Sequence, residues 1–326
     1  MIVKNDSGID GSGVAEWYHP TSYPRRMATL NALDPHFART WSEHAGRLLR
    51  RPELDRRKRL LVLAGQYTMR GDLNDLRETV SVAIEGGLDA REVLEAILQC
   101  YVYAGQSRVA DAAVVFHAVA DELGVLDHLR ASQPAMDRTT AGRSLADERQ
   151  QWAQSDADDP RLEGFLETYG WHGISTGLRL RPGHHINLVA TLDALDSDFL
   201  QIWLDSMYMN LYSRRVLDDA TRLLCVVGDC YAVGETHQSR RHMRGALRQG
   251  ARPRELLEVI FQSCAIVGHP NMLPLAVDDL VTIADEEGML GELVDEDHID
   301  DLRRIVAARV AKRDGVQDIG LPIQQR

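Results

Sequence analysis

The sequence predicts an all-α protein made of two tandem copies of one helical bundle. In its long apolar segments, hydrophobic residues recur three and four positions apart, the spacing of one helix face. No two alternating apolar runs are joined by a hairpin turn, so we expect no β-sheet. The chain also resembles itself when it is shifted by 163 positions, which indicates an internal repeat.

Two segments carry the self-similarity. LDRRKRLLVLAG, from Leu54, aligns with LDDATRLLCVVG, from Leu217, with six of twelve positions identical. GLDAREVLEAILQ, from Gly87, aligns with GARPRELLEVIFQ, from Gly250, with seven of thirteen identical. The shift is the same for both pairs, so the whole unit is duplicated.

The match extends upstream when the shift is reduced to 162 positions. ATLNALD, from Ala28, then aligns with ATLDALD, from Ala190. We expect two bundles that pack with internal pseudo-twofold symmetry, called here repeat 1 and repeat 2. The predicted divisions are an N-terminal extension (1–26), repeat 1 (27–126), a connector (127–188), repeat 2 (189–290), and a C-terminal helix and tail (291–326).

Each helix of repeat 1 has its own signals. Apolar residues predict helices over 57–69 and 73–85, each of which ends at glycine. Asp89 followed by Glu92 has the spacing of a capping box and starts a third helix. A fourth follows over 107–122. Repeat 2 has the same order of signals.

The flanking segments differ from the repeats. Residues 127–165 of the connector are charged, lack a long apolar stripe and predict one short polar helix. Near the C-terminus, Ile299, Leu302, Ile305, Val306 and Val310 have helical spacing with a polar opposite face.

Composition excludes several classes of function. The formal net charge of -12 argues against a nucleic-acid partner, which would need a basic face. No run approaches the roughly 20 apolar residues of a membrane span. The polar first residues lack the apolar core of a secretory signal, and no cysteines form a CxxC pair. We therefore expect a cytoplasmic location without a membrane partner.

The motif order resembles the carboxymuconolactone decarboxylase family. The segments that carry the resemblance are LDDATRLLCVVG, RRHMRGALRQG, and PRELLEVIFQ followed by VGHP. Repeat 1 matches less well, with Thr79 in place of His242 and Gln106 in place of His269. The resemblance implies an all-helical fold and frequent homo-oligomers. It also implies an activity from a family that includes lactone decarboxylases and thiol peroxidases.

Cysteine spacing separates these two branches. The peroxidase branch needs a CxxC motif with a nearby histidine. Cys225 and Cys230 are five apart on a predicted helix, where their sulfurs cannot meet. We therefore disfavour a thiol peroxidase and expect the decarboxylase chemistry, which needs no cofactor.

Repeat 2 contains the residue types that decarboxylation requires. His242 is the candidate proton carrier because imidazole titrates near neutral pH. Glu258 is expected to orient this histidine or to act as a base, and His269 is placed at the Gly-Pro turn after the same helix. Arg222 or Arg241 is expected to hold an acid group by a two-pronged contact.

Three further residues are candidates for binding the substrate. His184 and His185 follow a Pro-Gly turn just before repeat 2, and Tyr212 precedes its first long helix. Adjacent histidines can also bind a metal, but no HxxH or carboxylate triad surrounds them. We therefore predict no metal.

Structural alternatives accompany these assignments. Arg222 recurs as Arg59 in repeat 1, which favours an ion pair, with Asp218 or Asp55 as possible partners. The recurring glutamates can bridge to arginines or cap a neighbouring helix; they are Glu95 with Glu258 and Glu92 with Glu255.

The sequence thus predicts a cofactor-independent lyase that acts on a small carboxylated lactone or related organic acid, in aromatic catabolism or a specialised pathway. Repeat 2 is expected to be the working copy. The alternatives are a ring-opening hydrolase or isomerase on the same fold, and a non-catalytic oligomeric binding or accessory protein.

Overall fold

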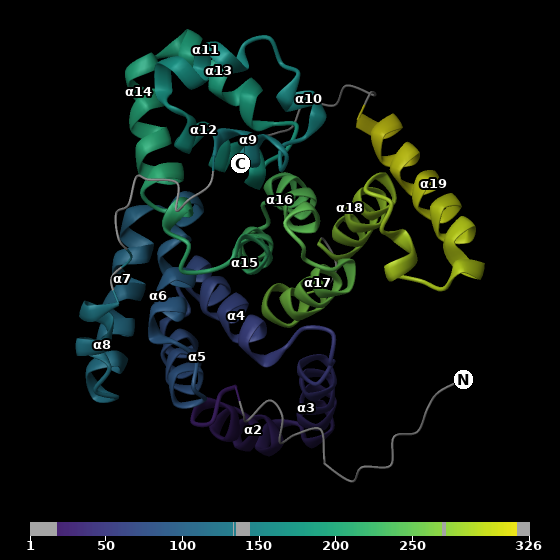
Figure 1. Cartoon of the computed structure of the whole chain (residues 1–326). Coiled ribbons are helices and arrows are strands. Elements are labelled where there is room, and N and C mark those ends of the chain that lie inside the picture. The colour runs from purple at the N-terminus through teal and green to yellow at the C-terminus, as the bar shows by residue number, and fades with distance from the viewer. Residues whose placement is uncertain (1–17, 133, 135–143, 269–271, 318–326) are drawn as a thin grey trace.

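The computed structural model describes residues 18–132, 134, 144–268 and 272–317, and all regular structure in these residues is helical (Figure 1). The predicted all-α class is therefore confirmed. The helices before and in repeat 1 are α2 (Ser22–Leu33), α3 (Pro35–Leu49), α4 (Arg56–Arg70), α5 (Leu73–Glu85), α6 (Ala90–Leu98) and α7 (Tyr101–Glu122). Those between the repeats are α8 (Leu126–Ala131), α9 (Leu145–Arg149), α10 (Gln154–Ala157), α11 (Leu162–Tyr169) and α12 (Trp171–Leu180), and α13 (His185–Leu195) leads into repeat 2. The remaining helices are α14 (Ser197–Trp203), η1 (Leu204–Met209), η2 (Tyr212–Arg214), α15 (Asp219–Ala232), α16 (Thr236–Arg248), α17 (Pro253–Val267), α18 (Leu273–Glu286), η3 (Leu290–Glu292), η4 (Glu296–His298) and α19 (Ile299–Gln317).

The two long apolar helices α4 and α15 pack against each other at the centre of the molecule (Figure 1). Around them, α4 packs against α5, α6 and α7, and α15 packs against α16 and α17. The helices α4, α5 and α6 of repeat 1 thus correspond to α15, α16 and α17 of repeat 2. Gly105 and Gly268, which are aligned at the shift of 163, both have positive φ, 74° and 81°; the first kinks α7 and the second ends α17. The duplication in the sequence is a duplication of structure.

The central crossing depends on a glycine in each helix. A Cβ at Gly228 would lie 2.7 Å from Val62 Cγ1, and one at Gly65 would lie 2.1 Å from Asp229 Oδ1. Both distances are shorter than a van der Waals contact, so any side chain here forces α4 and α15 apart.

Replacing Gly228 with alanine should lower the free energy of unfolding by about 1–3 kcal/mol, since the added methyl group meets the packed Val62 side chain. Gly164, on the exposed surface of α11, is the control because a Cβ there meets nothing within 4 Å. Gly164→Ala should leave stability unchanged or raise it by up to about 1 kcal/mol. Urea denaturation of both variants measures the difference, and equal stabilities would contradict the close crossing.

The connector is more structured than the sequence indicated. Residues 127–165 contain most of α8, all of α9 and α10, and the start of α11, so the expectation of one short polar helix was wrong; α12 follows. α12 is largely buried and packs against α16 of repeat 2. Its Arg179 pairs with the buried Glu148 of α9. Short buried helices with internal ion pairs lack the long apolar stripe on which the prediction depended.

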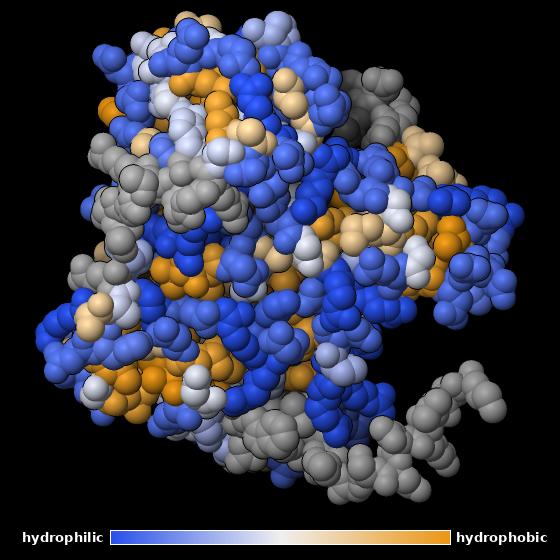
Figure 2. Space-filling model, in the orientation of Figure 1, coloured by the Kyte–Doolittle hydropathy of each residue, from blue (hydrophilic) through white to orange (hydrophobic). Residues whose placement is uncertain are grey.

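The C-terminal helix was predicted correctly, and α19 packs against α18 through the buried Val306. Hydrophilic residues cover much of the face in Figure 2, with separate hydrophobic patches between them. Exposed apolar side chains include Val114 on α7 and Phe199 and Ile202 on α14. In the part of the chain that the structure describes, no helix has the length and apolar character of a membrane span.

Candidate functional site

A buried ion pair joins repeat 1 to repeat 2. Arg222 on α15 donates to Glu95 Oε1 on α6 at 2.9 Å and to Gln99 Oε1 at 3.2 Å. Arg222 and Glu95 are both fully buried, and the Nε atom of Arg214 lies 3.4 Å from Glu95 Oε2. These contacts favour the structural alternative for Arg222, with a partner in the other repeat. The suggested partner Asp218 instead caps α15.

The same arrangement recurs at the pseudo-symmetric position. Arg59 on α4 donates to Gln262 Oε1 at 3.1 Å, and its Nη2 lies 3.5 Å from Glu258 Oε2. Arg51 Nε lies 2.6 Å from Glu258 Oε1. The structure therefore does not bring Glu258 to His242. The glutamate bridges to arginines, as its structural alternative stated.

His242 meets a tyrosine from the other repeat. It lies on α16, and its Nε2 is 2.5 Å from the hydroxyl oxygen of Tyr103 on α7. The rings meet edge to face, with centroids 5.9 Å apart. Tyr103 belongs to the YVYAG segment before the kink at Gly105, so the helix break of repeat 1 presents the phenol to repeat 2.

His242 is neutral in the folded protein. Burial and, after it, the positive charge of Arg181 lower the pKa of His242 to about 3. The expectation that this ring titrates near neutral pH is therefore wrong. Burial raises the pKa of Tyr103 well above its usual value, so the phenol keeps its proton. A histidine and a tyrosine in these states can relay a proton without either being charged at rest.

Arg181, the residue that ends α12, supplies the positive charge beside this pair. It is 7 % exposed, and its charge acts on the oxygens of Tyr208, Tyr103 and Tyr212. Its Nη2 donates to Gln238 Oε1 at 3.2 Å. No carboxylate in the described ranges forms a salt bridge with Arg181. We call His242, Tyr103, Arg181, Tyr208 and Tyr212 the His242 cluster.

Several buried polar atoms of the His242 cluster make no hydrogen bond of good geometry. Among the described residues these are the Tyr212 hydroxyl, His242 Nδ1 and Arg181 Nε. Looser hydrogen bonds act on the same side chains, from Tyr103 on Tyr212, from the Leu180 backbone on His242, and from Tyr208 on Arg181. Buried polar groups in folded proteins are nearly always satisfied, so these weakly bonded groups have capacity left for a ligand. Tyr212 also faces Arg222, whose guanidinium carbon lies 5.7 Å from the ring centroid.

A π-helix places Tyr208, and the short 3-10 helix that follows it begins at Tyr212. Residues Leu204–Met209 form η1, and Tyr208 lies within it. The alignment of the repeats has a shift of 162 at Trp203 and 163 at Arg214, so repeat 2 has one extra residue between them. A π-helix is how a helix absorbs one inserted residue, and such insertions are frequent at functional sites.

The sequence predicted His185 and Tyr212 as residues that bind the substrate. Tyr212 lies in the His242 cluster, but His185 packs inside the protein. It is fully buried, and its ring lies against Trp203 and Tyr208 with centroids 5.7 and 4.7 Å away. Its two ring nitrogens have no partner among the described residues. Burial lowers the pKa of His185 to about 3.

The neutral state of His185 predicts a pH-dependent loss of stability. Between pH 6.5 and about 4 the unfolded chain binds a proton that the folded His185 excludes. As the pH falls through this range, the wild type should lose about 1.4 kcal/mol per pH unit relative to His185→Phe. Denaturant unfolding at a series of pH values measures this difference, and a constant difference from pH 7 to 4.5 would contradict it.

The other expected site residues lie nearer the surface or beyond the described part. His184 is exposed at the start of α13, and Arg241 is partly exposed on α16. Both act on the pKa of His242, so both lie near it. Burial and, after it, the neighbouring arginines lower the pKa of His184, so only Arg241 is a lasting positive charge there. The region of the chain that includes His269 lies outside the described residues.

The cysteines are buried thiols. All four are free, and burial raises the pKa of each, to about 11 for Cys264. A thiol with a raised pKa is a poor nucleophile at neutral pH. These states weigh against peroxide chemistry.

Sequence reasoning missed three members of the His242 cluster: Tyr103, Arg181 and Tyr208. Two signals in the sequence pointed to the two tyrosines. The YVYAG segment of repeat 1 stands where repeat 2 has CAIVG, and the change of shift marks the insertion beside Tyr208. Nothing in the sequence singled out Arg181.

Comparison with known families gives two matches along the chain. The model described as the carboxymuconolactone decarboxylase family matches residues 35–118 and residues 198–277, about half of the chain together. A search of curated proteins gives no match.

Proposed function

Because the chain belongs to the carboxymuconolactone decarboxylase family, we propose that it is a cofactor-independent lyase that removes CO₂ from a small carboxylated lactone or related organic acid. One observation carries the proposal. Arg181 is a buried cation without a carboxylate partner among the described residues, and it lies beside the Tyr103–His242 pair. A buried cation of this kind is suited to an anionic substrate.

Arg181 is the proposed anchor for the substrate carboxylate. A guanidinium can hold a carboxylate through two parallel N–H donors, and the Nε of Arg181 has no partner in the described part of the chain. Arg241 adds positive potential at the approach to the His242 cluster. By contrast, Arg222 and Arg214 share the carboxylate of Glu95 and are assigned to the scaffold.

The tyrosine hydroxyls are the proposed partners of the charge that develops. When the bond between the ring carbon and the carboxylate breaks, its electron pair moves into the conjugated lactone carbonyl and forms a dienolate. Hydrogen bonds from preorganised buried donors stabilise such an oxygen. The proposed donors are the hydroxyls of Tyr208 and Tyr212, both of which are close enough to Arg181 to act on its charge.

Tyr103 is the proposed proton donor to carbon. In the tautomer that the proposal uses, His242 carries its proton on Nε2 and donates it to the oxygen of Tyr103. The hydroxyl proton of Tyr103 is then free to move to the substrate carbon. The phenolate that forms keeps an N–H donor and regains its proton from water, so one proton is consumed for each CO₂ released.

The proposed centre needs both repeats, since Tyr103 comes from repeat 1 and His242 from repeat 2. This differs from the expectation that repeat 2 alone does the work. Repeat 1 has lost the histidine of the family motif at Thr79 but supplies the phenol.

The proposal is tested with purified protein and 4-carboxymuconolactone, by CO₂ release and ultraviolet absorbance. Arg181→Met should lower kcat/KM by about 10- to 100-fold, largely through KM, because a charged hydrogen bond to the carboxylate is lost. Arg130→Met is the matched control, because Arg130 is exposed on α8 and pairs only with Asp127 among the described residues. The proposal fails if the wild type does not turn the lactone over, or if Arg181→Met has wild-type kinetics.

A further inference from the structure

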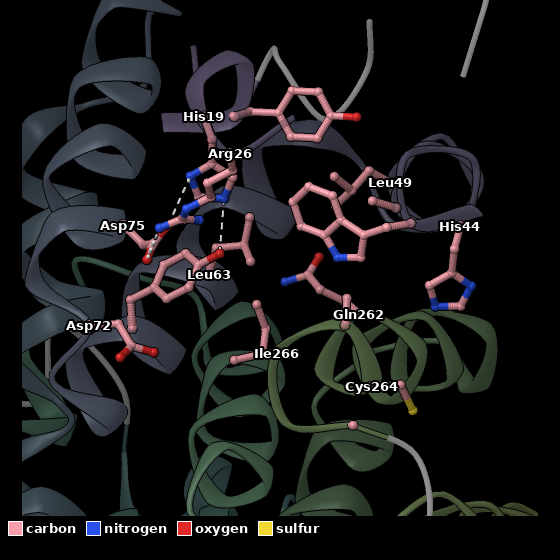
Figure 3. A pocket seen from close by; sticks show the side chains of 16 residues that line it. His19, Arg26, His44, Leu49, Leu63, Asp72, Asp75, Gln262, Cys264 and Ile266 are labelled. Atoms are coloured by element: carbon pink, nitrogen blue, oxygen red, sulfur yellow. Dashed lines mark hydrogen bonds and ion pairs between the residues drawn. The ribbon is translucent and has the colours of Figure 1, made fainter. Parts of the chain in front are cut away.

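A second polar site lies at the pseudo-symmetric position, and it has an open pocket (Figure 3). The cavity measures about 390 Å³. It lies between helices α3, α4 and α5 of repeat 1 and the end of α17 of repeat 2. Its polar lining residues are His19, Tyr23, Arg26, Trp41, His44, Tyr67, Asp72, Asp75, Gln262 and Cys264.

A chain of hydrogen-bonding groups runs along one wall of this pocket. The hydroxyl of Tyr67 lies 2.9 Å from His19 Nε2, and the other ring nitrogen of His19 lies 3.7 Å from Asp75 Oδ1. Arg26 closes the chain, with Nη2 donating to Asp75 Oδ2 at 2.9 Å. Figure 3 shows His19, Arg26 and Asp75 together at the edge of the pocket.

The pocket also has an aromatic lining. Tyr23 and Trp41 stack with centroids 5.5 Å apart and an interplanar angle of 22°. The hydroxyl of Tyr23 donates to Ser42 at 2.7 Å, which fixes the stack. Flat aromatic faces beside a small number of polar groups are typical of sites for small organic ligands.

This pocket lacks the free cation of the His242 cluster. At a shift of 162, His19 corresponds to Arg181, and at a shift of 163, Asp75 corresponds to Gln238. Where the His242 cluster has the guanidinium of Arg181, this pocket has the imidazole of His19. Where the cluster has the neutral amide of Gln238, this pocket has the carboxylate of Asp75. The only guanidinium among the described lining residues, that of Arg26, is already paired with Asp75.

Both sites nevertheless contain a tyrosine–histidine pair. The positions that supply it in the His242 cluster are occupied here by Thr79 and Ile266. Tyr67 and His19 restore the pair from two other positions. A repeat kept only as a scaffold has no need of a second phenol–imidazole pair in an open pocket.

We propose that this pocket is a second ligand site, which binds an uncharged aromatic molecule that carries a hydroxyl group, of the phenol class. The ring lies against the Tyr23–Trp41 stack and the hydroxyl meets the Tyr67–His19 pair. The proposal does not depend on the chemistry at His242.

Electrostatics disfavour the acid that the His242 cluster is suited to bind. A carboxylate here would lie near Asp75 and Asp72 and would meet no unpaired cation among the described lining residues, because Arg26 and Arg70 are already paired with these two carboxylates. A charge that is taken out of water without a partner is costly. The Cys264 thiol, whose pKa burial raises to about 11, adds no charge.

Calorimetric titration with p-cresol and with 4-hydroxybenzoate tests the proposal, because the two probes are similar in shape and differ in charge. We expect saturable binding of p-cresol at one site per chain, and binding of 4-hydroxybenzoate at this site at least about 10-fold weaker. Tyr67→Phe, which removes only the hydroxyl, should weaken p-cresol by about 5- to 10-fold. Trp41→Leu should weaken it further.

Tyr169→Phe is the matched control, because Tyr169 on α11 has a hydroxyl bonded to Asp193 and is not among the described lining residues. It should bind p-cresol as the wild type does. The proposal is overturned if p-cresol does not bind, if 4-hydroxybenzoate binds as tightly at the same site, or if Tyr67→Phe and Trp41→Leu leave the affinity unchanged. Since the readout is binding, these results stand whether or not the lactone is turned over.

Discussion

Replacing Tyr103 with phenylalanine should lower kcat for the lactone by about 10²- to 10⁴-fold, because the variant keeps the ring and loses the proposed proton donor. KM should change little, since Arg181 still holds the carboxylate. Tyr101→Phe is the control, because Tyr101 is exposed on the same helix, one turn or less away. Steady-state kinetics of the two variants give the comparison.

The pH profile distinguishes proton donation from a purely structural role. The pKa of His242 is about 3 and that of Tyr103 lies well above its usual value, so neither group titrates near neutrality. The wild type should therefore show a flat kcat from about pH 6 to 8. A kcat that follows a group titrating near pH 6.5 would contradict the uncharged state of the Tyr103–His242 pair. A Tyr103→Phe variant with wild-type kcat would contradict the role of Tyr103 as proton donor.

Arg222→Met should lower the free energy of unfolding by about 3–5 kcal/mol. It leaves Glu95 buried and charged, with only the more distant contact to Arg214. The double variant Arg222→Met, Glu95→Met should recover much of this loss, since no uncompensated charge remains. Urea denaturation measures all three proteins.

An exposed ion pair provides the control for this prediction. Arg77 and Glu122 form a salt bridge with both side chains well exposed, and Arg77→Met should cost less than about 1 kcal/mol. A similar small loss for Arg222→Met, or a double variant less stable than the single one, would contradict the role of the buried pair between repeats.

Much of the fold could be predicted from the sequence because its signals are local or internal. Helix spacing, caps such as Asp89, and the constant shift between the repeats are each readable in a short segment. The tandem arrangement and the helical class follow from these alone. The connector was not predictable in this way, since α12 is stabilised by packing against α16.

The partners in the candidate site were harder to predict because they come from distant parts of the chain. Arg222 was correctly suspected of an ion pair, but its partner Glu95 is on the other repeat. The contact of His242 with Tyr103 likewise joins residues of the two repeats. A helical pattern gives the buried face of each helix, but it does not say which face of another helix meets it.

One clue to the site was present in the register of the repeats. The shift changes by one residue between Trp203 and Arg214, and the structure absorbs the extra residue in a π-helix that carries Tyr208. A single inserted residue inside an otherwise matched helix is therefore a reason to look for functional side chains.

The central claim is that Tyr103 and His242 form one chemical centre across the two repeats, and a double-variant cycle tests it most directly. We would measure CO₂ release from 4-carboxymuconolactone by the wild type, Tyr103→Phe, His242→Ala and the double variant. Residues that act as a unit show non-additive losses, so the double variant should be about as slow as the slower single variant. Losses that multiply, or no turnover by the wild type, would contradict the claim.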